Sequence, residues 1–113
     1  AYFDNIGGLK GRAPVRSAGV TVGRVKSISY DNNKFEAKLV LGIESKYQFP
    51  EDTSAKILTS GLIGEQYIGL QPGSEEENLK NGSQILYTQS AVVLENLISQ
   101  FLFNKAEENN GGK

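Results

Sequence analysis

The fold of this chain is decided between residues 20 and 43, which read VTVGRVKSISYDNNKFEAKLVLGI. The first half is rich in β-branched residues, and its apolar positions are Val20, Val22, Val25, Ile28 and Tyr30. The second half alternates strictly, with one face formed by Phe35, Ala37, Leu39, Leu41 and Ile43. Such patterns are typical of strands, and the polar run 31–34 between them is turn material. The stretch therefore predicts a β-hairpin from Val20 to Ile43.

The alternation in the first half slips at Gly23-Arg24. A glycine inside a strand favours a β-bulge or a close crossing of two backbones, because it has no Cβ. The hairpin is therefore expected to bend, and the sheet that contains it is expected to be curved.

Further short strands are predicted on both sides of the hairpin. Ala1 to Asp4 has strand character, Ala55 to Thr59 alternates, Tyr67 to Leu70 is apolar, and Gln84 to Thr88 is a last short strand. Turns rich in glycine and proline separate them. Repeated short strands of this kind predict an all-β domain over residues 1–88, either a small antiparallel barrel or a sandwich.

After Ser90, a plausible N-cap, the apolar period changes to that of a helix. The apolar stripe consists of Leu94, Leu97, Ile98, Phe101 and Leu102. An amphipathic helix is therefore predicted over residues 89–104, followed by a disordered, Gly- and Asn-rich tail over residues 105–113. A helix of this length spans on the order of 20 Å, which is too short to cross a bilayer.

Composition narrows the function classes. The 113 residues carry a formal charge of −1, with scattered Lys and Arg, which disfavours nucleic-acid binding. The chain contains neither His nor Cys, so the usual nucleophile–base pairs and Cys- or His-based metal sites are absent and no enzyme is expected. The acidic pairs and the glycine pairs have neither the partners nor the spacing of metal or phosphate sites. The absence of Met and a start inside a strand indicate a piece of a longer protein.

Two apolar features remain as candidate functional elements. The first is the loop Gly61-Leu62-Ile63-Gly64, whose two large aliphatic side chains either fold into the domain core or face a partner surface. The second is the helix stripe, which either covers one end of the barrel or mediates self-association. The residue pattern by itself leaves both alternatives open.

Four stretches of the sequence are similar to the MCE (mammalian cell entry) domain family, and in particular to its single-domain members of phospholipid-transport systems. They are residues 3–9 followed by Pro14-Val15, residues 19–25, residues 50–57 and residues 61–73. Residues 90–102 resemble the C-terminal helix of the same members. The order and spacing of these stretches span the whole predicted barrel.

The resemblance implies a seven-stranded MCE β-barrel that assembles as a homohexameric ring. It also implies an N-terminal helix in the bacterial inner membrane, a periplasmic barrel, ABC permease and ATPase subunits, and a soluble periplasmic lipid carrier as partners. In that family the loop at Leu62 and Ile63 lines a central pore for phospholipid, and the C-terminal helices extend this hydrophobic conduit. Many relatives carry two leucines where this chain has Leu-Ile, which keeps the loop apolar.

The expected function is passage of phospholipid through an apolar pore that maintains the lipid asymmetry of the outer membrane, with no cofactor or metal. Two alternatives stay open at this point. One is a monomeric barrel that carries a lipid in its own interior, and the other is a ring that tethers a partner without conducting lipid.

Overall fold

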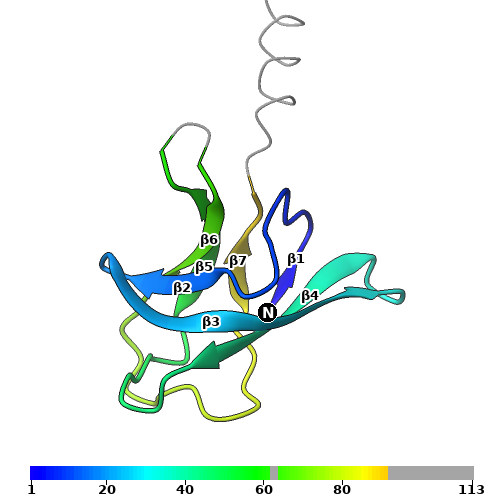
Figure 1. Ribbon diagram of the computed structural model, residues 1–113. Coiled ribbons are helices and arrows are strands. Elements are labelled where there is room, and N and C mark those ends of the chain that lie inside the picture. The colour runs from blue at the N-terminus through cyan, green and yellow to red at the C-terminus, as the bar shows by residue number, and fades with distance from the viewer. Residues whose placement is uncertain (62–63, 92–113) are drawn as a thin grey trace, which may run out of the picture.

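The computed structural model describes residues 1–61 and 64–91, which form a single mixed β-sheet rolled into a nearly closed barrel (Figure 1). The order of the strands across the sheet is β1-β4-β3-β2-β6-β5-β7. Their bounds are Tyr2–Phe3 (β1), Pro14–Ser17 (β2), Val20–Asp31 (β3), Glu36–Ile43 (β4), Ser54–Thr59 (β5), Gln66–Gln71 (β6) and Tyr87–Gln89 (β7). The two outermost strands, β1 and β7, lie next to each other, so the sheet curls almost back onto its own edge.

The predicted hairpin is confirmed as β3 and β4, which pair antiparallel from Gly23↔Ile43 to Asp31↔Glu36. Its turn is ordered by Asp31, whose Oδ1 accepts hydrogen bonds from the backbone N–H groups of Asn33 (2.8 Å) and Lys34 (2.9 Å). The Phe35 N–H closes the turn by donating to the Asp31 carbonyl oxygen at 2.8 Å.

Phe35 departs from the predicted alternation. It lies in the turn with a φ of +56°, and its side chain is 74% exposed. A left-handed backbone is unusual for a bulky residue and reverses the direction in which the side chain leaves the chain. The prediction that Phe35 shares the inward face of β4 is therefore wrong, and the inward face begins at Ala37, which packs partly buried against the core.

The predicted irregularity near Gly23 is confirmed as a close backbone crossing. A Cβ on Gly23 would overlap the carbonyl oxygen of Gly42 and would lie 2.9 Å from the Ile43 Cα. The register shifts themselves lie on either side of Gly23, at Val22 opposite β2 and at Lys26 opposite β4. Each shift leaves one extra residue on β3, which bends the strand because bulges increase local twist.

Two strand pairs run parallel, which corrects the expectation of a purely antiparallel domain. β2 pairs parallel with β6 through Val15↔Ile68, and β5 pairs parallel with β7 through Ala55↔Thr88. The neighbouring pair β5–β6 is antiparallel. Alternation predicts which residues of a strand point inward, but it carries no information about the direction of the partner strand.

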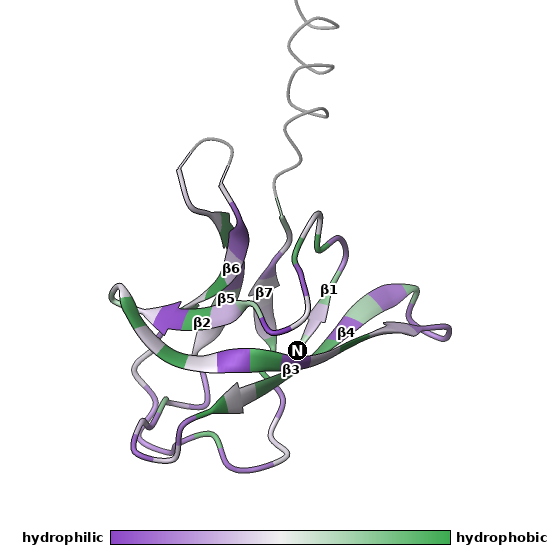
Figure 2. Ribbon diagram, in the orientation of Figure 1, coloured by the Kyte–Doolittle hydropathy of each residue, from purple (hydrophilic) through white to green (hydrophobic). Residues whose placement is uncertain are grey.

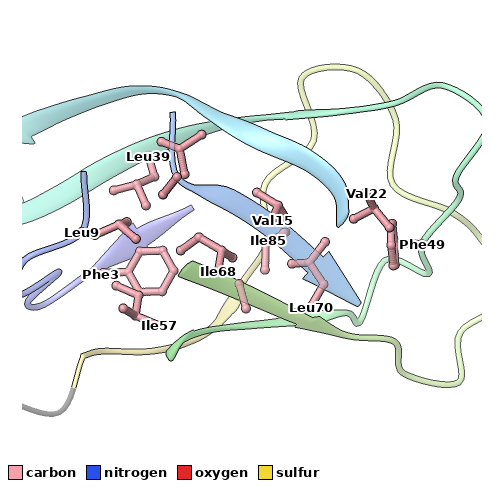
Figure 3. Packing of buried hydrophobic residues seen from close by; sticks show 13 residues of the cluster. Phe3, Leu9, Val15, Val22, Leu39, Phe49, Ile57, Ile68, Leu70 and Ile85 are labelled. Carbon is pink, nitrogen blue, oxygen red and sulfur yellow. The ribbon is translucent and has the colours of Figure 1, made fainter. Parts of the chain in front are cut away.

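The barrel interior is filled by side chains that point toward one another (Figure 3). Apolar and polar residues alternate along the strands that surround it (Figure 2). Phe3, Val15, Val25, Leu39 and Ile68 are at most 1% exposed. Each such side chain contributes about 1.5–3 kcal/mol by leaving water. The alternation predicted for residues 55–59 is confirmed, because Ala55 and Ile57 are buried. The strand predicted at residues 67–70 is confirmed as part of β6, where Ile68 and Leu70 are buried.

The last strand begins three residues later than predicted and ends at Gln89, one residue past the predicted end of the barrel domain. Residues 92–113 lie outside the described residues, so the helix predicted over residues 89–104 and the tail over residues 105–113 stay predictions. Within the described part of the chain, no helix has the length and apolarity needed to cross a bilayer.

Candidate functional site

The loop between β5 and β6 contains the apolar pair singled out by the sequence. The ladder of these strands ends at the pair Thr59↔Gln66, and the Ser60 N–H donates to the Glu65 carbonyl oxygen at 3.0 Å beyond it. The loop is therefore a hairpin extension that projects from one end of the barrel (Figure 1). Leu62 and Ile63, at its centre, lie outside the described residues.

The two glycines that flank this pair have different structural roles. Gly61 has a φ of +71°, a conformation that residues with a Cβ adopt at a cost. At Gly64 a Cβ would overlap the carbonyl oxygen of Ser60. The loop thus requires glycine for backbone conformation at one position and for close approach at the other. Gly61 and Gly64 lie outside the strands, between β5 and β6, as predicted, and the prediction for Leu62 and Ile63 lies outside the described residues.

The chain leaves the barrel toward its C-terminus at the same end. The Asn5 N–H donates to the Ser90 Oγ at 3.1 Å, and the Ala91 N–H donates to the Asn5 carbonyl oxygen at 2.9 Å. A Cβ on Gly7 would lie 3.0 Å from the Gln66 Oε1 and 3.1 Å from the Ala91 methyl group. The base of the β5–β6 loop, the β1–β2 connection and Ala91 therefore meet around Gly7.

We call this end of the barrel the loop end, formed by residues 5–10, 60–61, 64–66 and 90–91. The predicted stripe of Leu94, Leu97, Ile98, Phe101 and Leu102 follows Ala91 in the chain but lies outside the described residues. The structure thus places Gly61 and Gly64, which flank the apolar pair, at the same end of the barrel as Ala91, which precedes the segment with the apolar stripe.

The described rim of the loop end is polar and open to solvent. The Lys10 Nζ lies 3.4 Å from the Glu65 Oε1, with both side chains more than three-quarters exposed. Such a surface pair contributes at most about 1 kcal/mol. Among the described residues, no three His, Cys, Asp or Glu side chains form a group that suits a metal ion.

One of the acidic pairs noted in the sequence has a structural role. The Asp52 carboxylate accepts hydrogen bonds from the backbone N–H groups of Ser74 (2.8 Å) and Glu75 (3.1 Å). The bond from Ser74 is the largest cause of a lowered Asp52 pKa. The carboxylate therefore orders the turn after β6.

A second surface feature was missed by sequence reasoning. An open groove of about 390 Å³ runs over the outer face of β2, β6 and β5. Its lining includes Arg16, Lys56, Leu58, Tyr67 and Gly69. Its lining comes from β2 and the turn that follows it, from β5 and from β6, which are distant in sequence, so no contiguous motif marks it. We call it the outer groove.

Comparisons with known proteins agree with this architecture. The family model described as MlaD protein matches residues 1–73. An "Intermembrane phospholipid transport system binding protein MlaD" from Haemophilus influenzae is 48% identical over 117 residues, covering 100% of this chain and 70% of that protein. The protein of the same description from Escherichia coli K12 is 47% identical over 116 residues, covering 97% of this chain and 63% of its own length.

The fold has a close counterpart among solved structures. A chain of the Acinetobacter MlaFEDB complex in the ATP-bound Vtrans1 conformation superposes with a TM-score of 0.81 and 28% identity, covering 88% of this chain and 78% of that chain. A further relative is "Lipophilic envelope-spanning tunnel protein B" of Escherichia coli K12, which is 34% identical over 61% of this chain and 9% of its own length. These findings confirm the resemblance carried by the four sequence stretches: the chain belongs to the MlaD family of MCE-domain proteins.

Proposed function

We propose that this chain is the MCE subunit of an intermembrane phospholipid transport system and acts as a homohexameric ring with an apolar central pore. The proposal rests on one observation: the β5–β6 loop and the C-terminal segment both leave the barrel at the loop end. The loop frame Gly61 and Gly64, and Ala91 at the start of the C-terminal segment, stand on the same side of the barrel. In a ring of such subunits, the loop and the C-terminal segment of every subunit can therefore lie near the same central axis.

Leu62 and Ile63 line the pore in this proposal. Six copies of a two-residue aliphatic loop form a continuous apolar collar. An acyl chain is stabilised in apolar surroundings by about 0.8 kcal/mol per methylene, so the collar lowers the barrier to moving lipid across water. The contacts are individually weak and alike, which lets a chain slide.

The helices predicted over residues 89–104 extend this conduit. Their stripe of Leu94, Leu97, Ile98, Phe101 and Leu102 faces the ring axis, where it contacts the stripes of the other subunits and the lipid. The tie between Asn5 and residues 90–91 holds the start of the segment next to the pore loop.

The partners follow from the family. We propose that the ring sits on ABC permease and ATPase subunits of the MlaE, MlaF and MlaB kinds and exchanges phospholipid with an MlaC-like periplasmic carrier. The barrel then lies in the periplasm, held to the inner membrane by an N-terminal helix of the longer protein. The system maintains the lipid asymmetry of the outer membrane, and energy for transport comes from the ATPase.

The packing of the barrel argues against the monomeric lipid carrier. The interior is occupied by the side chains of the core cluster, including Phe3, Leu39 and Ile68. A bound acyl chain would need a cavity in this packed interior. Opening a cavity in a protein core costs about 20 cal/mol per Å² of cavity surface.

The pore assignment is tested by Leu62→Asp/Ile63→Asp. In a water-filled pore the double variant should keep its unfolding temperature and ring mass but lose phospholipid transfer, because charges at the constriction exclude acyl chains. The swap Leu62→Ile/Ile63→Leu is the matched control and should transfer lipid normally.

An Asp double variant that folds, assembles and still moves lipid contradicts the pore assignment. A variant that unfolds returns both residues to the domain core, and a ring that never conducts lipid in any form points to the tethering alternative.

A further inference from the structure

Two exposed surfaces on opposite sides of the barrel are not used by the proposed pore. One is the hairpin tip, residues 30–36 at the junction of β3 and β4, and the other is the outer groove (Figure 1). The hairpin tip lies to the side of the barrel, and the outer groove runs along β5 and β6 up to the pair Leu58↔Tyr67, next to the loop end. Their chemistry is complementary.

The hairpin tip presents two exposed aromatic side chains on an ordered turn. Tyr30 is 62% exposed and Phe35 is 74% exposed. The two Asp31 side-chain hydrogen bonds and the bond from the Phe35 N–H to the Asp31 carbonyl oxygen fix the turn between them. Exposed aromatic side chains on an ordered turn bind partners with little loss of conformational entropy, and such residues are enriched at interfaces.

The outer groove has a floor and walls suited to an aromatic side chain. The Leu58 side chain lies over Gly69, since a Cβ on Gly69 would lie 2.7 Å from the Leu58 Cδ1. Leu58 is 40% exposed, which is high for leucine on a strand, and provides an apolar wall. The Arg16 guanidinium lies 4.9 Å from the centre of the Tyr67 ring, and the buried Arg16 Nε has no hydrogen-bond partner among the described residues.

The two surfaces differ in charge. The hairpin tip carries the carboxyl groups of Asp31 and Glu36, and Asp4 from the segment after β1 lies beside Glu36. The pKa of Glu36 is raised, with hydrogen bonding to Asp4 as the largest cause. Two lysines accompany them. The Lys34 Nζ lies 3.7 Å from the centre of its own Tyr2 ring, and Lys38 follows on β4.

The outer groove carries Arg16 and Lys56, and among the described residues that line it there is no carboxylate. A groove of this sign would relieve the repulsion between the carboxyl groups of the tip.

We propose that the hairpin tip of one copy docks into the outer groove of the next copy, with Phe35 against Leu58 and the acidic groups facing Arg16 and Lys56. The inference rests on the proposed ring and specifies its subunit contact. Because the two surfaces differ and lie on opposite sides of the molecule, the contact is heterologous, and repeating such a contact closes a ring when the rotation fits. A second copy is the occupant because both complementary surfaces belong to this chain.

The first test removes the aromatic knob from the full-length chain by Phe35→Gly. Glycine suits the φ of +56°, so the subunit should fold at least as well as the parent. Subunit association, followed by mass as the protein is diluted, should weaken by about tenfold or more, as for a buried aromatic at an interface. Phe35→Tyr, which keeps the ring, should associate normally. An unchanged association of Phe35→Gly contradicts the contact.

The second test uses the absence of cysteine from the chain. The double variant Asn33→Cys/Ala18→Cys places one thiol on the hairpin tip and one at the edge of the outer groove. Mild oxidation should produce a ladder of covalent oligomers ending at the ring size. The single variants should give no ladder. A covalent dimer from Asn33→Cys alone would indicate a tip-to-tip contact and overturn the proposal.

The third test exchanges charges. Glu36→Lys and Lys56→Glu should each weaken association, and the double variant should recover much of it if these two groups meet across the contact.

The outcomes of the three tests distinguish this subunit contact from the proposed ring. A ring of normal mass with no ladder and no charge recovery overturns the contact and leaves the ring standing, whereas a parent chain that stays monomeric overturns both.

Discussion

At the scale of single residues, Asp52 shows how a surface carboxylate orders a turn. Its two backbone hydrogen bonds join the loop before β5 to the turn after β6. Gly73 makes this approach possible, because a Cβ there would overlap the Asp52 carboxyl group. The sequence shows an acidic pair at residues 51–52 but does not show which of the two is bonded.

We expect Asp52 to make stability depend on pH. Hydrogen bonds from Ser74 and Glu75 lower its pKa in the folded state, so the charged form is favoured by folding. The stabilisation is fully present above the ordinary Asp pKa of about 4 and is lost as pH falls through the lowered pKa. The free energy of unfolding of Asp52→Asn should therefore lie below that of the parent at neutral pH and converge with it in acid.

Denaturant unfolding of both proteins between about pH 7 and pH 2 measures this convergence. Glu51→Gln is the control, since it removes the neighbouring exposed carboxylate and leaves the turn intact. A gap between Asp52→Asn and the parent that stays constant across the pH range would show that Asp52 acts through shape and not through its charge.

At the scale of elements, the bent β3 strand is the central feature of the barrel, because it pairs with β2 on one edge and β4 on the other. Its two extra residues let one strand follow the curvature of the sheet. Gly23, between them, allows the β4 backbone to approach closely.

We expect Gly23→Ala to destabilise the domain. The added methyl group would overlap the Gly42 carbonyl oxygen, which belongs to the backbone and cannot rotate away. Overpacking of this kind typically costs about 1–3 kcal/mol. Thermal or denaturant unfolding measures the change. Gly11→Ala is the matched control, because none of the described residues lies within 4 Å of a Cβ at that position and the effect should be small. Equal stability of the two variants would mean that the backbone crossing relaxes easily.

At the scale of the whole molecule, the loop end carries the segment that we expect to contribute to ring assembly. A chain ending at Ala91 keeps the hydrogen bond from the Ala91 N–H to the Asn5 carbonyl oxygen, so its last residue stays tied to the segment after β1. It lacks only the segment that carries the apolar stripe. This cut separates the contribution of the helix from that of the barrel.

We expect the full chain to have a solution mass near six times 12.3 kDa, and the chain ending at Ala91 to dissociate more readily on dilution. The physical reason is the loss of the apolar contacts of the stripe at the ring axis. Mass measurement over a range of concentrations checks both statements, and unchanged unfolding of the shortened subunit is the control. An equally stable hexamer after the cut would assign the stripe to the conduit alone.

The sequence by itself determined the features that depend on neighbouring residues. Period-two alternation predicted the β3–β4 hairpin and the strand β5, and glycine at residue 23 predicted the bend, because the face of a strand follows from local geometry. The family resemblance rested on stretches with the right spacing. The loop at residues 61–64 was likewise visible, as two aliphatic residues between glycines.

Only the tertiary structure decided the features that depend on which strands meet. The parallel pairs β2–β6 and β5–β7, the contact between β1 and β7, and the outer groove all join segments distant in sequence. Phe35 was misplaced for a related reason. Its left-handed backbone is imposed by the turn that Asp31 ties together, and a hydrogen-bonded turn overrides an alternation that would otherwise continue inward. Hydropathy patterns describe the faces of a strand, whereas the packing of the whole barrel selects each strand's partner and direction.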